Sequence, residues 1–595
     1  MNIPLRQYWE LLSQHIRPQR GRFTLLAIMM LGSIGLQVIN PQLMRFFIDT
    51  ALAGGALSSL TYAAIGFIVI ALSQQAVAVS VTYLGESVAW KATNALRAEL
   101  AWHCLNLDMG FHNDHTPGEL IERIDGDVTE LANFFSQFLV MVVGNGLLLV
   151  GILAALFIED WRAGLAFTAF AALALYALNR VRDIGMVYQK AFRQACADLY
   201  GYVEEQLSAT EDVRSSGAVD FSLRELYRLQ AEIMRHDSKS EYKSWIINNV
   251  TGGMMAIGVI LAVSSGYLLY TAGAVTIGTV YLFVHYVTLL DQPIWALTRQ
   301  LENFQTIGAC VERLTELRKI QPKVLSAIPE RSAQMPAGSS GSAGITASKP
   351  IGLVFDDVKF SYNDTDAILN GLSFDLQPGR VLGLLGRTGS GKSTITRLIF
   401  RLYDPSNGVV RVDGQDARQI NLQSLRRCIG IVTQEVQLFR ASVRDNLTYF
   451  DGSISDDQII QVLEELELGE WLRGLPDGLS TELQTGGHSL SSGEAQLLAF
   501  ARIFLRNPGL VILDEASSRL DPVTEQRIER AIDRLLRGRT GIIVAHRLAT
   551  VHRADEIMIL DGGRIFEHGL REHLAQDPDS RFYQLLQTGM EEMLA

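Results

Sequence analysis

Six long apolar segments in the first 300 residues constrain the fold of this chain more than any other feature of its sequence. A helix that crosses a bilayer needs about 20 mostly apolar residues. Because backbone polar groups find no partners in lipid, segments of this kind must be helical. The segments are Thr24–Phe46, Leu60–Leu84, Phe138–Ile158, Ala163–Leu178, Val250–Tyr270 and Val275–Leu297. The fourth is short by itself, and we expect it to continue beyond Asn179.

The connections between these segments indicate how the chain is oriented in the membrane. Those after the first, third and fifth segments are a few residues long, whereas those after the second and fourth run to about 50 and about 70 residues. Lys and Arg concentrate in the N-terminal stretch and the two long connections; the short loops carry only Arg162, with Arg45 near the end of the first segment. The positive-inside tendency therefore predicts a multi-pass protein of the cell membrane, with its N-terminus, long connections and C-terminal region in the cytoplasm.

The two long connections contain no apolar run of membrane length. They are rich in Ala, Leu, Glu and Arg, which is typical of helices that continue into water. Each is interrupted once, at His115–Glu119 and at Arg214–Ala218. We therefore expect each connection to be two long helices joined by a turn.

The composition of the chain changes after the last apolar segment. Residues 329–350 are rich in Pro, Gly, Ser and Ala, which predicts a flexible linker. The linker would separate a membrane domain, residues 1–328, with an N-terminal interfacial helix, from a soluble domain, residues 351–595. The net charge of −12 argues against a nucleic-acid partner. The four cysteines show neither metal-ligand nor disulfide spacing, so we expect reduced thiols.

A glycine-rich loop in the soluble domain predicts a phosphate site. It follows a short apolar strand, Arg380–Leu385, precedes a helix, and matches G-x-x-x-x-G-K-[ST]. Glycines let consecutive backbone N–H groups surround phosphate oxygens, and the helix N-terminus adds its dipole. We expect Lys392 to reach the β- and γ-phosphates of ATP and Ser393 to ligate Mg²⁺. The residues of the site are Gly386, Arg387, Thr388, Gly389, Ser390, Gly391, Lys392, Ser393 and Thr394.

Two carboxylates follow a second apolar strand. Four consecutive apolar residues, 510–513, are typical of a central parallel strand, and Asp514 and Glu515 come directly after them. We expect Asp514 to hold Mg²⁺ through water and Glu515 to polarise the attacking water. The predicted fold class is therefore a polytopic α-helical membrane domain of six spans plus a cytoplasmic α/β P-loop ATPase domain.

With these motifs in place, the last 245 residues resemble an ABC nucleotide-binding domain, and the whole chain resembles an ABC exporter half-transporter. Tyr362, in Phe-Ser-Tyr, matches the family's aromatic loop and would stack on adenine. Gln434 matches the glutamine loop, which senses Mg²⁺ and contacts the membrane domain. His546 matches the switch histidine that contacts the γ-phosphate. The resemblance thus implies that Glu515, His546 and Gln434 are catalytic.

Two further motifs imply a second chain. Leu490–Glu494 resembles the signature sequence, which binds the γ-phosphate of ATP held by the opposite subunit. Asp521 matches the aspartate loop that joins the two sites. The resemblance implies that two nucleotide-binding domains sandwich two ATP molecules, and that the cytoplasmic turns rest on the ATPase domain and transmit its motion. The signature residues are Ser491, Ser492, Gly493 and Glu494.

The chain departs from the family pattern at two places. The usual signature is L-S-G-G-Q, whereas here Ser492 replaces a glycine and Glu494 replaces the glutamine. Residues 481–487 also lack the acidic-basic pair that exporters usually carry before the final glycine. A side chain and a carboxylate facing phosphate would weaken one ATP site, so we favour a heterodimer with a second half-transporter. A homodimer that tolerates Ser492 is the alternative.

The direction of transport and the cargo stay open at this level. An exporter is the main reading because six spans precede the ATPase on one chain; an importer on the same scaffold, or an ATP-gated channel or sensor subunit, is the alternative. A mixed apolar cavity would suit an amphipathic or hydrophobic substrate. Polar residues in the spans are expensive in lipid and are therefore candidates for substrate contact or for packing between helices. They are Gln74, Gln75, Asn145, His285 and Asp291.

Overall fold

The computed structural model describes residues 13, 17–324, 349–363, 366–433, 436–484, 490–514, 522–545 and 548–588. The chain forms two compact units, one of Met1–Leu105 and Pro117–Ile320, the other of Asn106–Thr116 and Gln321–Ala595. The predicted linker falls outside the described residues except for Lys349 and Pro350, and the predicted N-terminal interfacial helix falls largely outside them.

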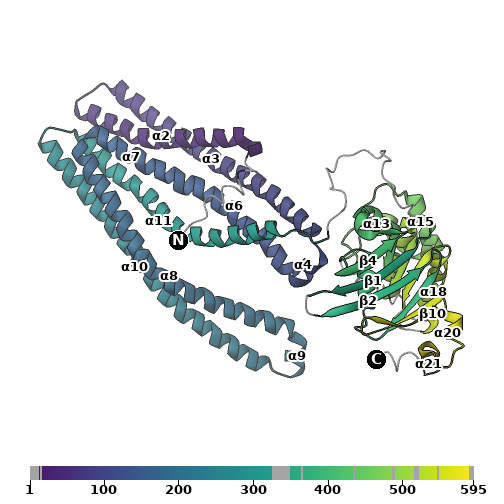
Figure 1. The fold of residues 1–595 in the computed structure, drawn as a ribbon. Helices are drawn as coiled ribbons and strands as arrows, with labels where there is room; N and C mark the ends of the chain where they lie inside the picture. Colours follow the sequence, from purple (N-terminus) through teal and green to yellow (C-terminus); the bar gives the residue numbers. More distant parts are fainter. Residues whose placement is uncertain are drawn as a thin grey trace. The chain divides into compact units, whose positions relative to one another are not determined.

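The described residues of the first unit form helices joined by short turns (Figure 1). Its long helices contain the six predicted spans, the third of which begins in a π-helical turn, η3 (Phe138–Gly144). The fourth predicted span continues well past Asn179, as expected. The long helices are α2 (Arg20–Leu52), α3 (Leu57–Asn106), α7 (Asn145–Glu159), α8 (Trp161–Ser208), α10 (Val219–Thr271) and α11 (Ile277–Lys319).

Five of these helices have a stretch long and apolar enough to cross a membrane. The sixth, α11, is continuous over 43 residues. Its apolar run is interrupted by His285, Asp291 and Gln292, which lower its hydropathy. It is nevertheless the last helix before the soluble domain, so α11 is the remaining candidate span.

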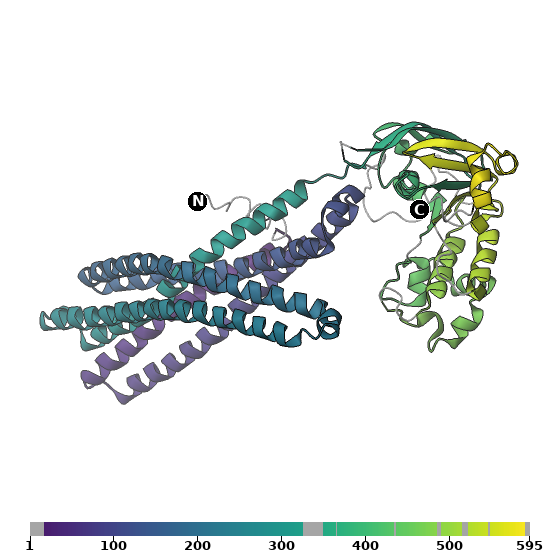
Figure 2. The same cartoon turned by 90° about the horizontal axis from the view of Figure 1, so that it is seen from below.

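The second predicted turn is confirmed, and the first connection is also interrupted as predicted but has an extra short helix before the interruption. In the first, α3 is followed by α4 (Met109–Asp114), α5 (Pro117–Ile121) and η2 (Glu122–Gly126), and then by α6 (Asp127–Gln137). In the second, α8 and α10 lie side by side and are joined through α9 (Thr210–Ser215) (Figures 1 and 2). Gly217 ends α9 with a φ of 67°, a left-handed conformation that favours glycine.

The second unit contains two sheets. An antiparallel sheet has the order β2-β1-β4-β5, and a six-stranded sheet has the order β10-β9-β3-β8-β7-β6, in which only β10 pairs antiparallel. The strands are β1 (Leu353–Ser361), β2 (Ala367–Leu376), β3 (Val381–Gly386), β4 (Asn407–Val412), β5 (Gln415–Asp416), β6 (Ile429–Val432), β7 (Leu510–Asp514), β8 (Thr540–Val544), β9 (Glu556–Asp561) and β10 (Arg564–Leu570). This arrangement confirms the α/β prediction.

Helices flank the parallel sheet, and one apolar cluster lies on each of its faces, one around Phe500 and one around Leu384. The clusters bury β3, β7 and β8 completely apart from Asp514 at the end of β7. The helices are α12 (Lys392–Ile399), α13 (Leu422–Cys428), α14 (Val443–Thr448), α15 (Asp456–Glu465), α16 (Gly469–Gly474), α17 (Ser492–Arg506), α18 (Pro522–Leu536), α19 (Leu548–Val551), α20 (Arg571–Leu574) and α21 (Arg581–Thr588).

Candidate functional site

The predicted glycine-rich loop joins β3 to α12 and depends on its glycines. Gly386, Gly389 and Gly391 have φ values of 147°, 83° and 106°, which other residues rarely adopt. A methyl group at Gly386 would lie 2.5 Å from the carbonyl oxygen of Leu560, and one at Gly391 would lie 2.7 Å from the side chain of Leu369. The loop therefore requires glycine for both backbone conformation and space.

The polar groups inside this loop are arranged to meet an anion. Lys392 is only 6% exposed, and its Nζ donates to the carbonyl oxygens of Gly386 (2.5 Å) and Arg387 (3.0 Å). The hydroxyl of Ser390 is buried, and among the described residues it has no hydrogen-bond partner. A buried hydroxyl without a partner is costly, so the loop fits an acceptor-rich ligand such as a phosphate.

The remaining loop residues divide between solvent and core. Arg387, Thr388, Gly389 and Ser393 are exposed, as a ligand-facing surface requires, whereas Thr394 is buried. The hydroxyl of Thr394 lies 3.2 Å from the hydroxyl of Tyr362.

Tyr362 lies just after β1 and is held against α12. Its hydroxyl accepts a hydrogen bond from Nη1 of Arg397 (2.8 Å) and lies 3.2 Å from the hydroxyl of Thr394. The guanidinium of Arg397 also stands 5.6 Å from the ring centroid. The Tyr362 side chain is 37% exposed, so part of its ring remains available for stacking. Sequence reasoning identified Tyr362 but missed Arg397. Its position on α12, one helical turn after Ser393, is the sequence feature that could have indicated it.

A second tyrosine connects this region with the first cytoplasmic turn. The ring of Tyr403 makes edge contacts with Phe360 (5.5 Å) and Tyr362 (5.1 Å). Its hydroxyl accepts a hydrogen bond from Nδ2 of Asn113 in α4 at 2.9 Å, and burial raises the pKa of Tyr403. Residues 106–116 belong to the same compact unit as the ATPase fold, which supports the expectation that this turn rests on it. Sequence analysis did not single out Tyr403.

The predicted catalytic acids and sensors follow strands of the parallel sheet, and the described residues include these strands but only one of the side chains, Asp514. Strands β6, β7 and β8 are parallel to β3, so their carboxyl ends share the edge where the glycine-rich loop begins. Asp514, at the end of β7, pairs with Val544 of β8 at this edge and is partly exposed. Four predicted site residues lie outside the described residues: Gln434, Glu515, Asp521 and His546.

The signature residues form the N-terminus of α17. Ser491 caps the helix: its hydroxyl accepts from the Glu494 N–H (3.2 Å), and the Glu494 carboxylate accepts from the Ser491 N–H (2.8 Å) and hydroxyl (2.9 Å). Gly493 is buried, and a methyl group there would lie 2.1 Å from Cγ2 of Thr524 in α18. Ser491 and Ser492 are exposed.

This capping box changes the interpretation of Glu494. Sequence reasoning treated its carboxylate only as a charge that would repel phosphate, whereas it also occupies both donors of Ser491. The S-x-x-E spacing is the sequence signal that would have revealed the cap. A phosphate that approached Ser491 would therefore compete with the chain's own carboxylate.

Comparison with known proteins matches both units. The family described as "ABC transporter" matches residues 369–518, and the family described as "ABC transporter transmembrane region" matches residues 23–294. An ATP-dependent lipid A-core flippase of Photobacterium profundum is 30% identical over 85% of this chain and 84% of that protein. The Bacillus subtilis protein named "Probable multidrug resistance ABC transporter ATP-binding/permease protein YheH" is 29% identical over 86% of this chain and 75% of its own length.

One solved structure shares the complete fold. It is a bacterial Atm1-family ABC exporter with ATP bound, superposable with a TM-score of 0.76 over 96% of this chain and 98% of the other, at 24% identity. At that identity the likeness concerns the fold alone.

Replacing Lys392 with Ala should weaken ATP binding. The substitution removes a charge-assisted contact to phosphate, which is worth ~1.5–3 kcal/mol and corresponds to about ten- to a hundredfold in affinity. Equilibrium titration with ATP would measure the change, with the exposed lysine variant Lys359→Ala as the matched control. Equal affinities in the two variants would contradict the role assigned to Lys392.

Substitutions at Glu494 should separate its capping role from its charge. Glu494→Ala keeps the Ser491 cap but removes the two hydrogen bonds that the carboxylate accepts from Ser491, and should destabilise the ATPase domain by ~1 kcal/mol. Glu494→Gln keeps a capping-box residue and should unfold at nearly the original temperature. Thermal unfolding of both variants is the measurement. If Ala and Gln were equally stable, the carboxylate–Ser491 hydrogen bonds would not contribute to stability.

Proposed function

Because this chain belongs to the ABC transporter family, as an exporter-type half-transporter, we propose that it couples ATP hydrolysis to the export of an amphipathic or hydrophobic molecule. The observation that carries the proposal is the fusion, on one chain, of a helical membrane domain with a complete phosphate-binding loop. ATP-driven export and a cytoplasmic ATPase domain follow from the family. The names of the relatives, which refer to a lipid and to drugs, support the class of substrate.

The residues of the site would divide the work as follows. The loop glycines, Ser390 and Lys392 would bind the phosphates of ATP, and Tyr362 would stack on the adenine. Ser393 and Gln434 directly, and Asp514 through water, would hold Mg²⁺, which when bound neutralises phosphate charge. Glu515 would then polarise the attacking water, and His546 would contact the γ-phosphate. The buried, unpartnered Ser390 hydroxyl supports the first of these roles.

A half-transporter works as a dimer, and we propose that the partner is a different chain. In a homodimer both composite sites would face Ser492 and a Ser491 whose donors already bind Glu494. In a heterodimer, the hydrolytic residues of this chain could face a normal signature on the partner. The altered signature would then face a partner site that binds ATP but hydrolyses it slowly. A homodimer that tolerates the altered signature remains the alternative.

The polar residues in the spans differ in how well they are placed to contact a substrate. Asn145 is buried in α7, and its Nδ2 donates to the carbonyl oxygen of Met141 at 2.8 Å, which supports a packing role. His285 is half-buried against Tyr281, whereas Asp291 is exposed. Six residues along a helix turn a side chain about 120° away, so at most one of His285 and Asp291 would line the same cavity.

Transport by inverted membrane vesicles tests the proposed direction. With a panel of amphipathic dyes and labelled lipids, ATP should drive accumulation inside the vesicles. Glu515→Gln should lower both hydrolysis and uptake by about two orders of magnitude or more, because only the water-activating carboxylate is lost and ATP binding remains. An ATP-driven loss of preloaded substrate would indicate an importer, and ATP-dependent leakage without accumulation would indicate a channel. Near-normal hydrolysis by the variant would contradict the role of Glu515.

The heterodimer can be tested by expressing the chain alone. We expect little ATP turnover until a second, non-identical half-transporter is added, because each site needs one competent signature. Turnover of the purified chain, alone and with the partner, is the measurement, and the mass of the complex is its control. Robust hydrolysis and transport by a two-fold symmetric dimer would contradict the proposal.

A further inference from the structure

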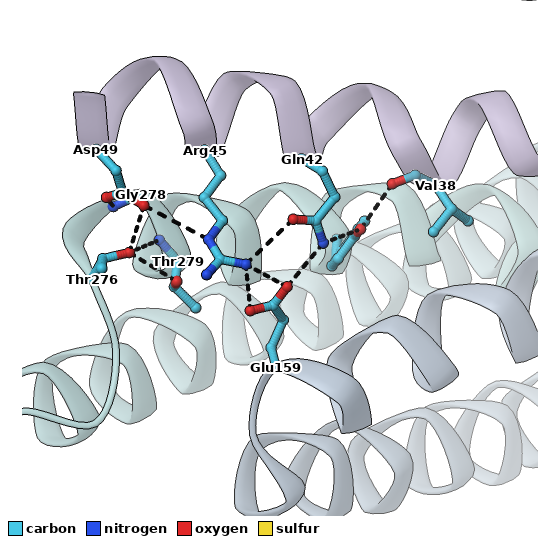
Figure 3. Close-up of polar contacts among 9 residues, drawn as sticks. Val38, Gln42, Arg45, Asp49, Glu159, Thr276, Gly278 and Thr279 are labelled. Atoms are coloured by element: carbon cyan, nitrogen blue, oxygen red, sulfur yellow. Dashed lines mark hydrogen bonds and ion pairs between the residues drawn. The ribbon is translucent and has the colours of Figure 1, made fainter. Parts of the chain in front are cut away.

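A polar cluster joins three helices at the non-cytoplasmic end of the membrane domain (Figure 3). Arg45 of α2 contacts both carboxylate oxygens of Glu159, the last residue of α7. Nε2 of Gln42, also on α2, donates to the same carboxylate at 3.0 Å. The side chain of Glu159 is 12% exposed and that of Arg45 is 30% exposed. This end lies beside the short connections, opposite the long cytoplasmic ones.

The same face of α2 reaches the start of α11. Asp49 accepts hydrogen bonds from the Gly278 N–H (2.9 Å) and the Thr276 hydroxyl (2.8 Å), close to the positive end of the helix dipole. A methyl group at Gly278 would lie 2.7 Å from the carbonyl oxygen of Arg45. The two helices are therefore in close contact here, and Gly278 permits it.

About two turns further along α11, Tyr286 continues the contact between α2 and α11. Its hydroxyl donates to the carbonyl oxygen of Val38 (2.8 Å) and accepts from Gln42 (3.3 Å). Thr279 precedes Tyr286 by seven residues and so lies on the same face of α11. Thr279 is only 1% exposed. We call the contacts of Gln42, Arg45 and Asp49 with Glu159, Gly278 and Tyr286 the outer seam.

Apolar packing divides the membrane domain along this seam. Among the described residues, the buried members of the main apolar cluster all come from α7, α8, α10 and α11, and α2 adds only the partly buried Ile34 and Val38 at its rim. The buried residues Leu26 and Met30 of α2 pack instead with Val81 of α3. Apart from the apolar contacts of Ile34 and Val38, the outer seam joins these two apolar bodies by charges and hydrogen bonds.

A polar seam at an aqueous end can open and close reversibly. When such groups part, water replaces each lost partner, so the net free-energy change is small compared with that of separating apolar surfaces. An apolar contact of equal size would instead expose its surface to water. The seam is therefore the joint between α2 and the other helices that water can most easily open.

We propose that the outer seam is the latch of the export pathway: the Arg45–Glu159 pair holds α2 against α7 and α11 while the outer side is closed, and it parts when the transporter opens outward. This inference rests on the proposed function, because only a transporter has to open its outer side. It assigns Arg45 and Glu159 a role in access, separate from ATP hydrolysis and from contact with the substrate.

Thiol labelling of a Thr279→Cys variant tests the latch. The assembled transporter, in right-side-out vesicles, is treated from outside with a membrane-impermeant thiol reagent, and labelling is read on this chain. Of the four native cysteines, Cys104, Cys310 and Cys428 are buried. The partly buried Cys196 lies on the part of α8 that continues into the cytoplasm, so the parent chain without the added cysteine supplies the background rate. Without nucleotide the thiol should react slowly. After trapping with ATP and vanadate it should react about tenfold faster, since local opening converts a buried thiol into a solvated one.

Charge variants test whether the Arg45–Glu159 ion pair controls the labelling rate of the Thr279→Cys thiol. Glu159→Gln should raise the labelling rate without nucleotide, and exchanging the charges, Arg45→Glu with Glu159→Arg, should return it toward the slow value. The matched control is Glu99→Gln, which removes the partner of Arg318 (2.7 Å) at the cytoplasmic end and should leave the rate unchanged.

The outcomes separate the latch from the proposed function. Trapped nucleotide is measured in every sample, and its absence would mean that the ATPase assignment, not the latch, has failed. With nucleotide trapped, equal labelling rates in both states would overturn the latch. So would a Glu159→Gln variant that labels as slowly as the parent, or a Glu99→Gln control that labels as fast as Glu159→Gln.

Discussion

The need to satisfy every backbone hydrogen bond in lipid shapes the whole molecule. Helices are the only way to meet that need on a single chain with these apolar segments, so the membrane domain is made of long helices that continue into the cytoplasm. Ion pairs that join different helices lie toward the helix ends, as with Arg45–Glu159 and Arg318–Glu99. Apolar packing around Phe167 and Phe283 holds α7, α8, α10 and α11 together.

The two ends of the membrane domain are held with different strength. At the cytoplasmic end, the side chain of Asp127 in α6 is 3% exposed, and its partner Arg313 of α11 is 45% exposed. Removing one partner of a buried pair typically costs ~3–5 kcal/mol, because the other charge stays buried. At the outer end Glu159 is 12% exposed and Arg45 is 30% exposed, so water reaches this carboxylate more readily than it reaches Asp127. The cytoplasmic joint therefore resists separation more strongly than the outer joint does.

Local sequence patterns predicted the fold and the phosphate loop. They missed contacts between residues that are far apart in the sequence. Hydropathy predicted the spans because residues in the lipid core must be mostly apolar. The glycines predicted the loop because other residues rarely adopt their φ values. Arg45 and Glu159 are 114 residues apart, and Asn113 and Tyr403 are 290 apart, so no local pattern connects either pair. The Glu494 cap was visible in the sequence as S-x-x-E. The roles of Gln434, Glu515, Asp521 and His546 stay predictions.

Helix α11 is the element that brings the two joints together. It is 43 residues long, or about 64 Å at 1.5 Å per residue. Near its C-terminal end Arg313 binds Asp127, and at its N-terminal end Gly278 binds Asp49. A packed helix transmits displacement along its axis, and bending is easiest at Pro293, where the backbone ladder lacks a donor. Because one continuous helix carries both contacts, a displacement of its cytoplasmic end would reach the outer seam if the latch operates as proposed.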